Sequence, residues 1–104
     1  MSKLPESITE HLEEIREMCA RNHVRRLSLI DDPSAPVPNF IAEFEPHPDA
    51  LVRGRRFHAV WSGLFDFVGD NNLKTPEMIE QDLNPFRVVA LRQHEIYEAE
   101  RRSA

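Results

Sequence analysis

The sequence predicts a small α/β domain in which a three-stranded mixed sheet is covered by about four helices. Three observations lead to this prediction. The chain has 104 residues, enough for one core, because a chain of this size buries only about two thirds of its unfolded surface. It is 40% hydrophobic and 30% charged, as ordinary globular proteins are. Segments with helical periodicity alternate with short strand-like segments, and we expect residues 1–104 to form a single domain.

The first segment is predicted to be a helix. Ser7-Ile8-Thr9-Glu10 matches a capping box, in which the Ser side chain accepts a backbone N–H bond and the Glu reaches back. Apolar residues then recur at helical spacing as far as Cys19, and Asn22-His23 is expected to end the helix. Residues 24–30 follow as a predicted strand.

A second strand is predicted at residues 39–45, where side chains alternate between two faces. Phe40, Ala42 and Phe44 share one face of this strand. The connecting residues 31–38 hold Pro33, Pro36 and Pro38. Because proline donates no ladder hydrogen bond, this connection is not expected to be a central strand.

The second half predicts a long helix at residues 51–68, which carries a broad apolar face. A short third strand is expected at 71–74. Thr75-Pro76-Glu77 then resembles a helix start, with an N-cap, a Pro at the first helical position and an acid in the first turn. Asn84-Pro85 repeats this signal. A last helix is then expected to present one stripe made of Phe86, Val89, Ala90, Gln93, Ile96 and Tyr97.

Charge and cysteine content limit the possible partners. The formal charge is −5, which argues against broad binding to nucleic acid or to anionic membranes. Cys19 is the only cysteine, so an internal disulfide is impossible. No apolar segment is long enough for a signal peptide or a membrane span, and we expect a cytoplasmic protein without a cofactor. The basic cluster Arg53, Arg55 and Arg56 is interpreted as a solvated helical turn, with a partner's acidic groups or RNA as the alternative.

Several segments together resemble one protein family. The first helix, Val24-Arg25-Arg26-Leu27-Ser28-Leu29 and Ile41-Ala42-Glu43-Phe44-Glu45-Pro46 are similar to the minimal nucleotidyltransferases, small prokaryotic relatives of the DNA polymerase beta superfamily. Leu73-Lys74-Thr75-Pro76-Glu77 resembles the last strand of that family and the turn after it, and Ile96-Tyr97-Glu98-Ala99 resembles its closing helix. The resemblance rests on framework residues and spans nearly the whole chain.

The resemblance also identifies the positions that would carry catalysis. Active members have Gly-Ser after the first strand, which holds a triphosphate. They also have Asp-x-Asp on the next strand and a third Asp on the last, and these carboxylates hold two Mg²⁺. In this chain Gly-Ser falls on Asp31 and Asp32, Asp-x-Asp on Val37-Pro38-Asn39, and the third Asp on Asn72. Because Mg²⁺ prefers carboxylates, we expect no catalytic, cofactor-binding or metal-binding residues.

Three functions are considered. The first is a catalytically inactive interaction protein, which the resemblance pairs with a helical HEPN-type partner in an antitoxin-like role. The second is a nucleotidyltransferase that transfers AMP to protein, with a metal site rebuilt from Asp31, Asp32 or Glu43. The third is a self-associating structural subunit. The candidate interface is an apolar stripe that is read alternatively as plain core: Phe57, Trp61, Leu64 and Phe65.

Overall fold

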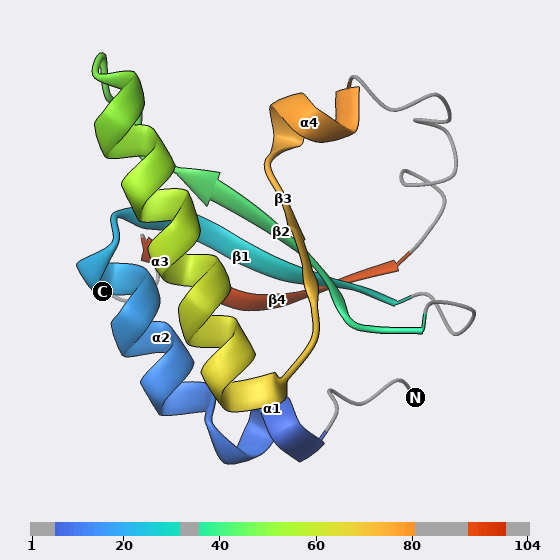
Figure 1. Cartoon of the computed structure of the whole chain (residues 1–104). Coiled ribbons are helices and arrows are strands. Elements are labelled where there is room, and N and C mark those ends of the chain that lie inside the picture. The colour runs from blue at the N-terminus through green and yellow to red at the C-terminus, as the bar shows by residue number, and fades with distance from the viewer. Residues whose placement is uncertain (1–5, 32–35, 81–91, 100–104) are drawn as a thin grey trace.

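The computed structural model describes residues 6–31, 36–80 and 92–99. These residues form an α/β fold with a four-stranded mixed sheet and four helices (Figure 1). In chain order the elements are α1 (Glu6–Glu10), α2 (Leu12–Arg21), β1 (Val24–Asp31), β2 (Asn39–Phe44), α3 (Ala50–Val68), β3 (Asn72–Lys74), α4 (Pro76–Glu80) and β4 (Arg92–Glu98). The α/β class is confirmed, whereas the prediction of three strands is wrong.

The strands lie in the order β3-β2-β1-β4. β1 is antiparallel to both of its neighbours, β2 and β4. β2 and β3 are parallel, and α3 provides the crossover that a parallel pair requires. The first three strands lie within one residue of their predicted bounds.

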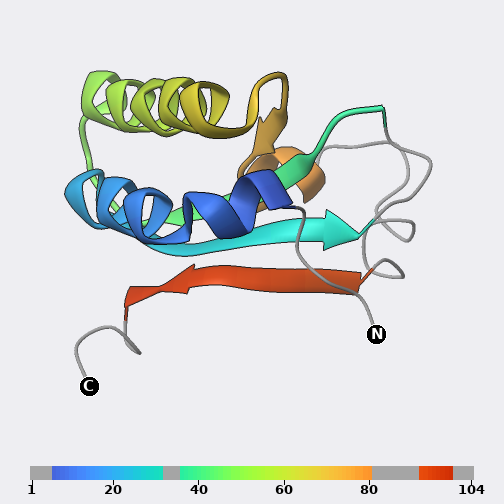
Figure 2. The ribbon, with the colours of Figure 1, turned by 90° about the horizontal axis from the view of Figure 1, so that it is seen from below.

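The core lies between the sheet and the helices α1, α2 and α3, which share one face of the sheet (Figure 2). The predicted alternation in β2 is confirmed, because Phe40 and Ala42 are buried and Phe44 packs against the core. On β1 the residues opposite them, Leu29 and Leu27, are buried as well. Burial of large apolar side chains at about 1.5–3 kcal/mol each is the main stabilising contribution in such a core.

The predicted first helix is divided into two. α1 ends at Glu10, and a turn at His11 separates it from α2. Ser7 lies inside α1, which begins at Glu6, and the Thr9 hydroxyl donates to the Glu6 carbonyl at 3.0 Å. The His11 ring stacks on Phe67 of α3, with 5.3 Å between ring centroids. This contact fixes the bend against α3.

α3 begins and ends with local signals. Asp49 is the N-cap, and its Oδ1 accepts a bond from the Leu51 amide at 2.9 Å, as N-cap carboxylates do. Gly69 follows the last helical residue with φ of +80°, a conformation that favours glycine. α3 is the longest helix described, and no described helix has the length and apolar character needed to cross a membrane.

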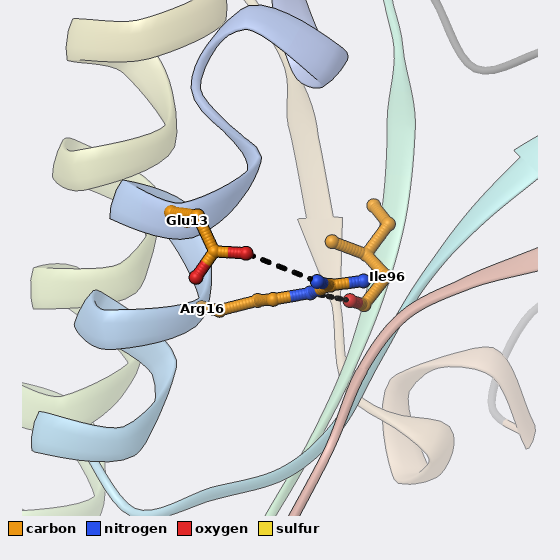
Figure 3. Close-up of polar contacts among 3 residues, drawn as sticks. All are labelled: Glu13, Arg16 and Ile96. Atoms are coloured by element: carbon orange, nitrogen blue, oxygen red, sulfur yellow. Dashed lines mark hydrogen bonds and ion pairs between the residues drawn. The ribbon is translucent and has the colours of Figure 1, made fainter. Parts of the chain in front are cut away.

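The predicted last helix is wrong where the structure describes it. Arg92–Glu98 is the strand β4, hydrogen-bonded to β1 at the edge of the sheet. Ile96 and Tyr97 are buried there, so their apolar character serves a strand. Arg16 of α2 donates from Nε to the Ile96 carbonyl at 3.1 Å and from Nη1 to Glu13 at 3.3 Å (Figure 3). Residues 84–91 of the expected helix lie outside the described residues.

Candidate functional site

Asn39 and Asn72, the two asparagines at positions that the resemblance assigns to catalytic motifs, meet at one end of the sheet. Ile30, near the end of β1, is paired with Asn39 at the start of β2. Asn39 is in turn paired with Asn72 at the start of the parallel strand β3. Residues far apart in the sequence are therefore adjacent because the α3 crossover returns the chain to the same end of the sheet.

Two side-chain amides form the centre of this arrangement. Asn72 Nδ2 donates to Asn39 Oδ1 at 2.9 Å. The backbone supports the pair, since the Asn72 amide donates to the Pro38 carbonyl at 2.9 Å. Asn39 Nδ2 makes a longer contact of 3.5 Å to the Val37 carbonyl. A neutral amide pair satisfies itself by hydrogen bonding, whereas two carboxylates at this separation repel unless a proton or cation lies between them.

The remaining motif positions are only partly described. The backbone of Asp31 ends β1 and is paired with Arg92 of β4. The side chain of Asp31 and the whole of Asp32 lie outside the described residues. Val37 is half-buried and precedes β2. It offers no metal ligand in its side chain.

Glu43 is not part of this sheet end. It lies four residues beyond Asn39 on β2 and is paired with Arg26, about 13 Å away at the rise of an extended strand. Within the ranges 6–31, 36–80 and 92–99, no three His, Cys, Asp or Glu side chains are grouped so that they could hold a metal ion. Cys19 is fully buried in the core, and burial raises its pKa to about 12. Its thiol is therefore not a reactive nucleophile at neutral pH.

The four candidate interface residues of α3 differ in how far they are exposed. Leu64 is fully buried, and the Phe57 ring packs 6.4 Å from that of Phe44. Trp61 and Phe65 are 39% and 46% exposed. Their rings lie 5.9 Å apart.

We define the outer face of α3 by six of its exposed residues: Leu51, Gly54, Arg55, His58, Trp61 and Phe65. Leu51 is 71% exposed there, and the His58 ring lies 6.1 Å from that of Trp61. A hollow of about 390 Å³ lies beside Gly54 on this face, lined also by Leu51 and His58. Leu51, His58 and Phe65 recur at intervals of seven residues. This spacing is a sequence signal for the outer face of α3 that the sequence prediction did not use.

The structure also contains a second hollow, which the sequence did not predict. It has a volume of about 660 Å³ and lies between the end of β2, the first half of α3 and the start of α4. Phe44, Phe57 and Met78 contribute apolar surface to its lining, and Arg53 and Glu77 contribute charged groups. Its residues come from three separate elements, so no local pattern in the sequence identifies it.

Comparison with known proteins adds no relative, because no protein-family model, no curated protein and no solved structure matches this chain. The fold and the sheet end therefore define the class of protein only as a small mixed α/β domain with an amide pair between two parallel strands.

Proposed function

We propose that this chain is a catalytically inactive relative of the minimal nucleotidyltransferases and acts as a protein-interaction module through the outer face of α3. The observation that carries this proposal is the amide pair of Asn39 and Asn72. Positions that the resemblance assigns to two separate metal-binding carboxylates are neighbours in space, as a shared metal site requires. Both carry neutral amides instead.

The loss of charge explains why catalysis is not proposed. Two-metal nucleotidyl transfer needs anionic oxygens that hold Mg²⁺ on both sides of the reacting phosphate. Asn39 and Asn72 use their side-chain groups in a hydrogen bond to each other. Val37, at the remaining matched position of this strand, supplies no side-chain oxygen.

The interaction surface is proposed because α3 exposes large apolar side chains on one side. Leu51, Trp61 and Phe65 are each more than a third exposed. Clustered aromatic side chains of this kind are typical anchors of protein interfaces. A helical partner fits a helix face of this length, and the resemblance points to a HEPN-type protein in an antitoxin-like pair.

Catalytic inactivity is tested with α-labelled ATP and Mg²⁺. We expect no label on any protein and no binding heat with ATP and Mg²⁺ at millimolar concentration. Label that is transferred in a Mg²⁺-dependent way would contradict the proposal and would favour the alternative, a nucleotidyltransferase with a rebuilt site.

Partner binding is tested with the purified HEPN-type product of a neighbouring gene. The double variant Trp61→Ala/Phe65→Ala is expected to weaken the complex at least about tenfold in titration calorimetry, as loss of interface anchors does. Met78→Ala is the matched control, because Met78 is 43% exposed but lies outside α3. Equal losses in both variants would argue against the outer face of α3.

A further inference from the structure

The outer face of α3 has the residue spacing of a helix-packing seam. Leu51, His58 and Phe65 recur every seven residues. Gly54 and Trp61, three residues after Leu51 and His58, repeat at the same interval. These are the a and d positions of a heptad, the pattern by which two helices pack knobs into holes. The core-facing residues Val60 and Leu64, on an adjoining side of the helix, are fully buried.

The seam contains both a projection and a hollow. Phe65 is 46% exposed near one end of α3. Near the other end, a Cβ built on Gly54 meets no atom within 4 Å, and a shallow depression open to solvent lies beside it. α1 and α2 pack against the side of α3 that faces the core (Figure 2). One helix therefore presents both halves of a complementary surface.

We propose that two copies of this chain pair through antiparallel α3 helices, with Phe65 of each copy seated against Gly54 of the other. This inference rests on the part of the proposed function that makes the outer face of α3 an interface, and it names a second copy as the occupant in place of a HEPN-type helix. An antiparallel pair centred between His58 and Trp61 places Gly54 opposite the second copy's Phe65. It also places His58 opposite the second copy's Trp61. The two-fold axis repeats each contact, as an isologous interface requires.

Charges on one flank of the seam favour a second copy over an unrelated helix. Arg55 and Asp66 are eleven residues apart, which is three helical turns, so they lie on the same flank of α3. Both are exposed, and neither has an ion-pair partner among the residues that the structure describes. In the antiparallel pair Arg55 of each copy approaches Asp66 of the other. Each copy therefore carries the opposite charges that the flank of the other copy needs.

The mass of the full chain in solution tests this pairing. In sedimentation equilibrium between about 5 µM and about 500 µM, a micromolar dimer is expected to change from 12.1 kDa to twice that mass. A mass that stays at 12.1 kDa over this range overturns the inference.

The Gly54→Leu variant tests the proposed contact between Phe65 of one copy and Gly54 of the other. Leucine is a good helix former and the site is open, so the monomer is expected to keep its fold by circular dichroism. Its dimerisation is expected to weaken at least about tenfold, because the added side chain fills the hollow. Glu17→Leu, at an exposed position of α2, is the matched control and is expected to keep the wild-type dimer. A Gly54→Leu chain that dimerises as well as the wild type overturns the inference.

A charge exchange tests the flank. Arg55→Asp and Asp66→Arg are each expected to weaken the dimer several-fold, because each places like charges opposite each other. The double variant restores the opposite signs and is expected to return to within about threefold of wild type. Failure of the double variant to recover contradicts the proposed alignment.

The result separates this inference from the proposed function. A chain that stays monomeric, yet loses its HEPN-type partner on Trp61→Ala/Phe65→Ala substitution, overturns self-pairing and supports the interaction module. A dimer that Gly54→Leu disrupts, in a chain whose α3 variants still bind the HEPN-type protein, supports self-pairing and overturns the assignment of that protein to this face.

Discussion

Arg16 Nε donates a hydrogen bond to the carbonyl oxygen of Ile96 at 3.1 Å, and this bond joins α2 to the edge strand β4 (Figure 3). The carbonyl lies where the ladder between β1 and β4 shifts register, since Leu27 is paired with Tyr97 and Ser28 with Glu95. At such a shift one residue has no direct partner in the ladder. The Arg16 guanidinium supplies the hydrogen bond that the Ile96 carbonyl needs there.

Arg16→Ala is therefore expected to lower the free energy of unfolding by about 1–2 kcal/mol, the range for a hydrogen bond from a charged donor in a partly buried place. Urea denaturation measures this change. Glu13→Ala removes only the exposed ion pair to Arg16 and is expected to cost less than about 0.5 kcal/mol. Equal effects of the two substitutions would show that the Ile96 carbonyl bond contributes nothing of its own.

The amide pair predicts how the sheet end responds to restored carboxylates. Asn39→Asp with Asn72→Asp replaces the 2.9 Å hydrogen bond by two negative charges. We expect the free energy of unfolding at pH 7 to fall by about 1–2 kcal/mol, from the lost bond and the repulsion. Mg²⁺ at millimolar concentration is expected to raise the melting temperature of this variant and not that of the wild type. A double variant that is indifferent to Mg²⁺ would count against the resemblance to nucleotidyltransferases.

Two glycines of the same helix are expected to respond in opposite ways to alanine. A Cβ at Gly63 would collide with the Sδ atom of the buried Met18, so Gly63→Ala is expected to destabilise the fold by about 1–3 kcal/mol through overpacking. Gly54 has open space, and Gly54→Ala is expected to stabilise the monomer by about 0.5–1 kcal/mol through helix propensity. Thermal melts at low micromolar concentration compare the two. The same sign of effect at both positions would contradict the packing of α2 on α3.

Cys19 predicts a loss of stability in alkali. Burial raises the pKa of this thiol from its ordinary value of 9.0 to about 12. The unfolded chain therefore releases the proton at lower pH than the folded chain. The contribution of the Cys19 thiol to the free energy of unfolding is therefore complete below pH 9. It is lost as the pH rises towards 12, by at most about 1.4 kcal/mol per pH unit.

Urea denaturation at pH 8 and at pH 10 measures this effect, with Cys19→Ala as the reference. The variant is expected to lose less stability between the two pH values than the wild type does. Identical losses in both proteins would mean that the thiol is not protected in the folded state.

The elements with a local cause were predictable from the sequence. The alternation of Phe40, Ala42 and Phe44 reports which face of β2 is buried, and the structure buries that face. The helix start at Pro76 is also local, because the Thr75 hydroxyl accepts a bond from the Met78 amide at 3.3 Å.

β4 had no such local cause. Gln93, Ile96 and Tyr97 fit a helical stripe, but the sequence between Arg92 and Glu98 is short enough to suit a strand as well. This segment becomes a strand because it pairs with β1, which is far away in the sequence. Such long-range pairing is invisible to periodicity, and it overrides local propensity.

The sheet end was predicted in part. The resemblance assigned Asn39 and Asn72 to one site, and the register of β2 and β3 places them side by side. Their mutual hydrogen bond depends on that register and on side-chain rotamers, which no sequence pattern contains. On α3, burial separates Leu64 from Trp61 and Phe65, a distinction that an apolar stripe alone does not make.

The central place of β1 has a consequence for synthesis on the ribosome. β1, β2, α3 and β3 are all translated before β4, the strand that covers the other edge of β1. Until β4 emerges, a nascent chain that has already folded its hairpin presents an open row of backbone donors and acceptors along β1. Open edges of this kind recruit foreign strands. The interval between the synthesis of β3 and the synthesis of β4 is therefore when misassembly through the open edge of β1 is most to be expected.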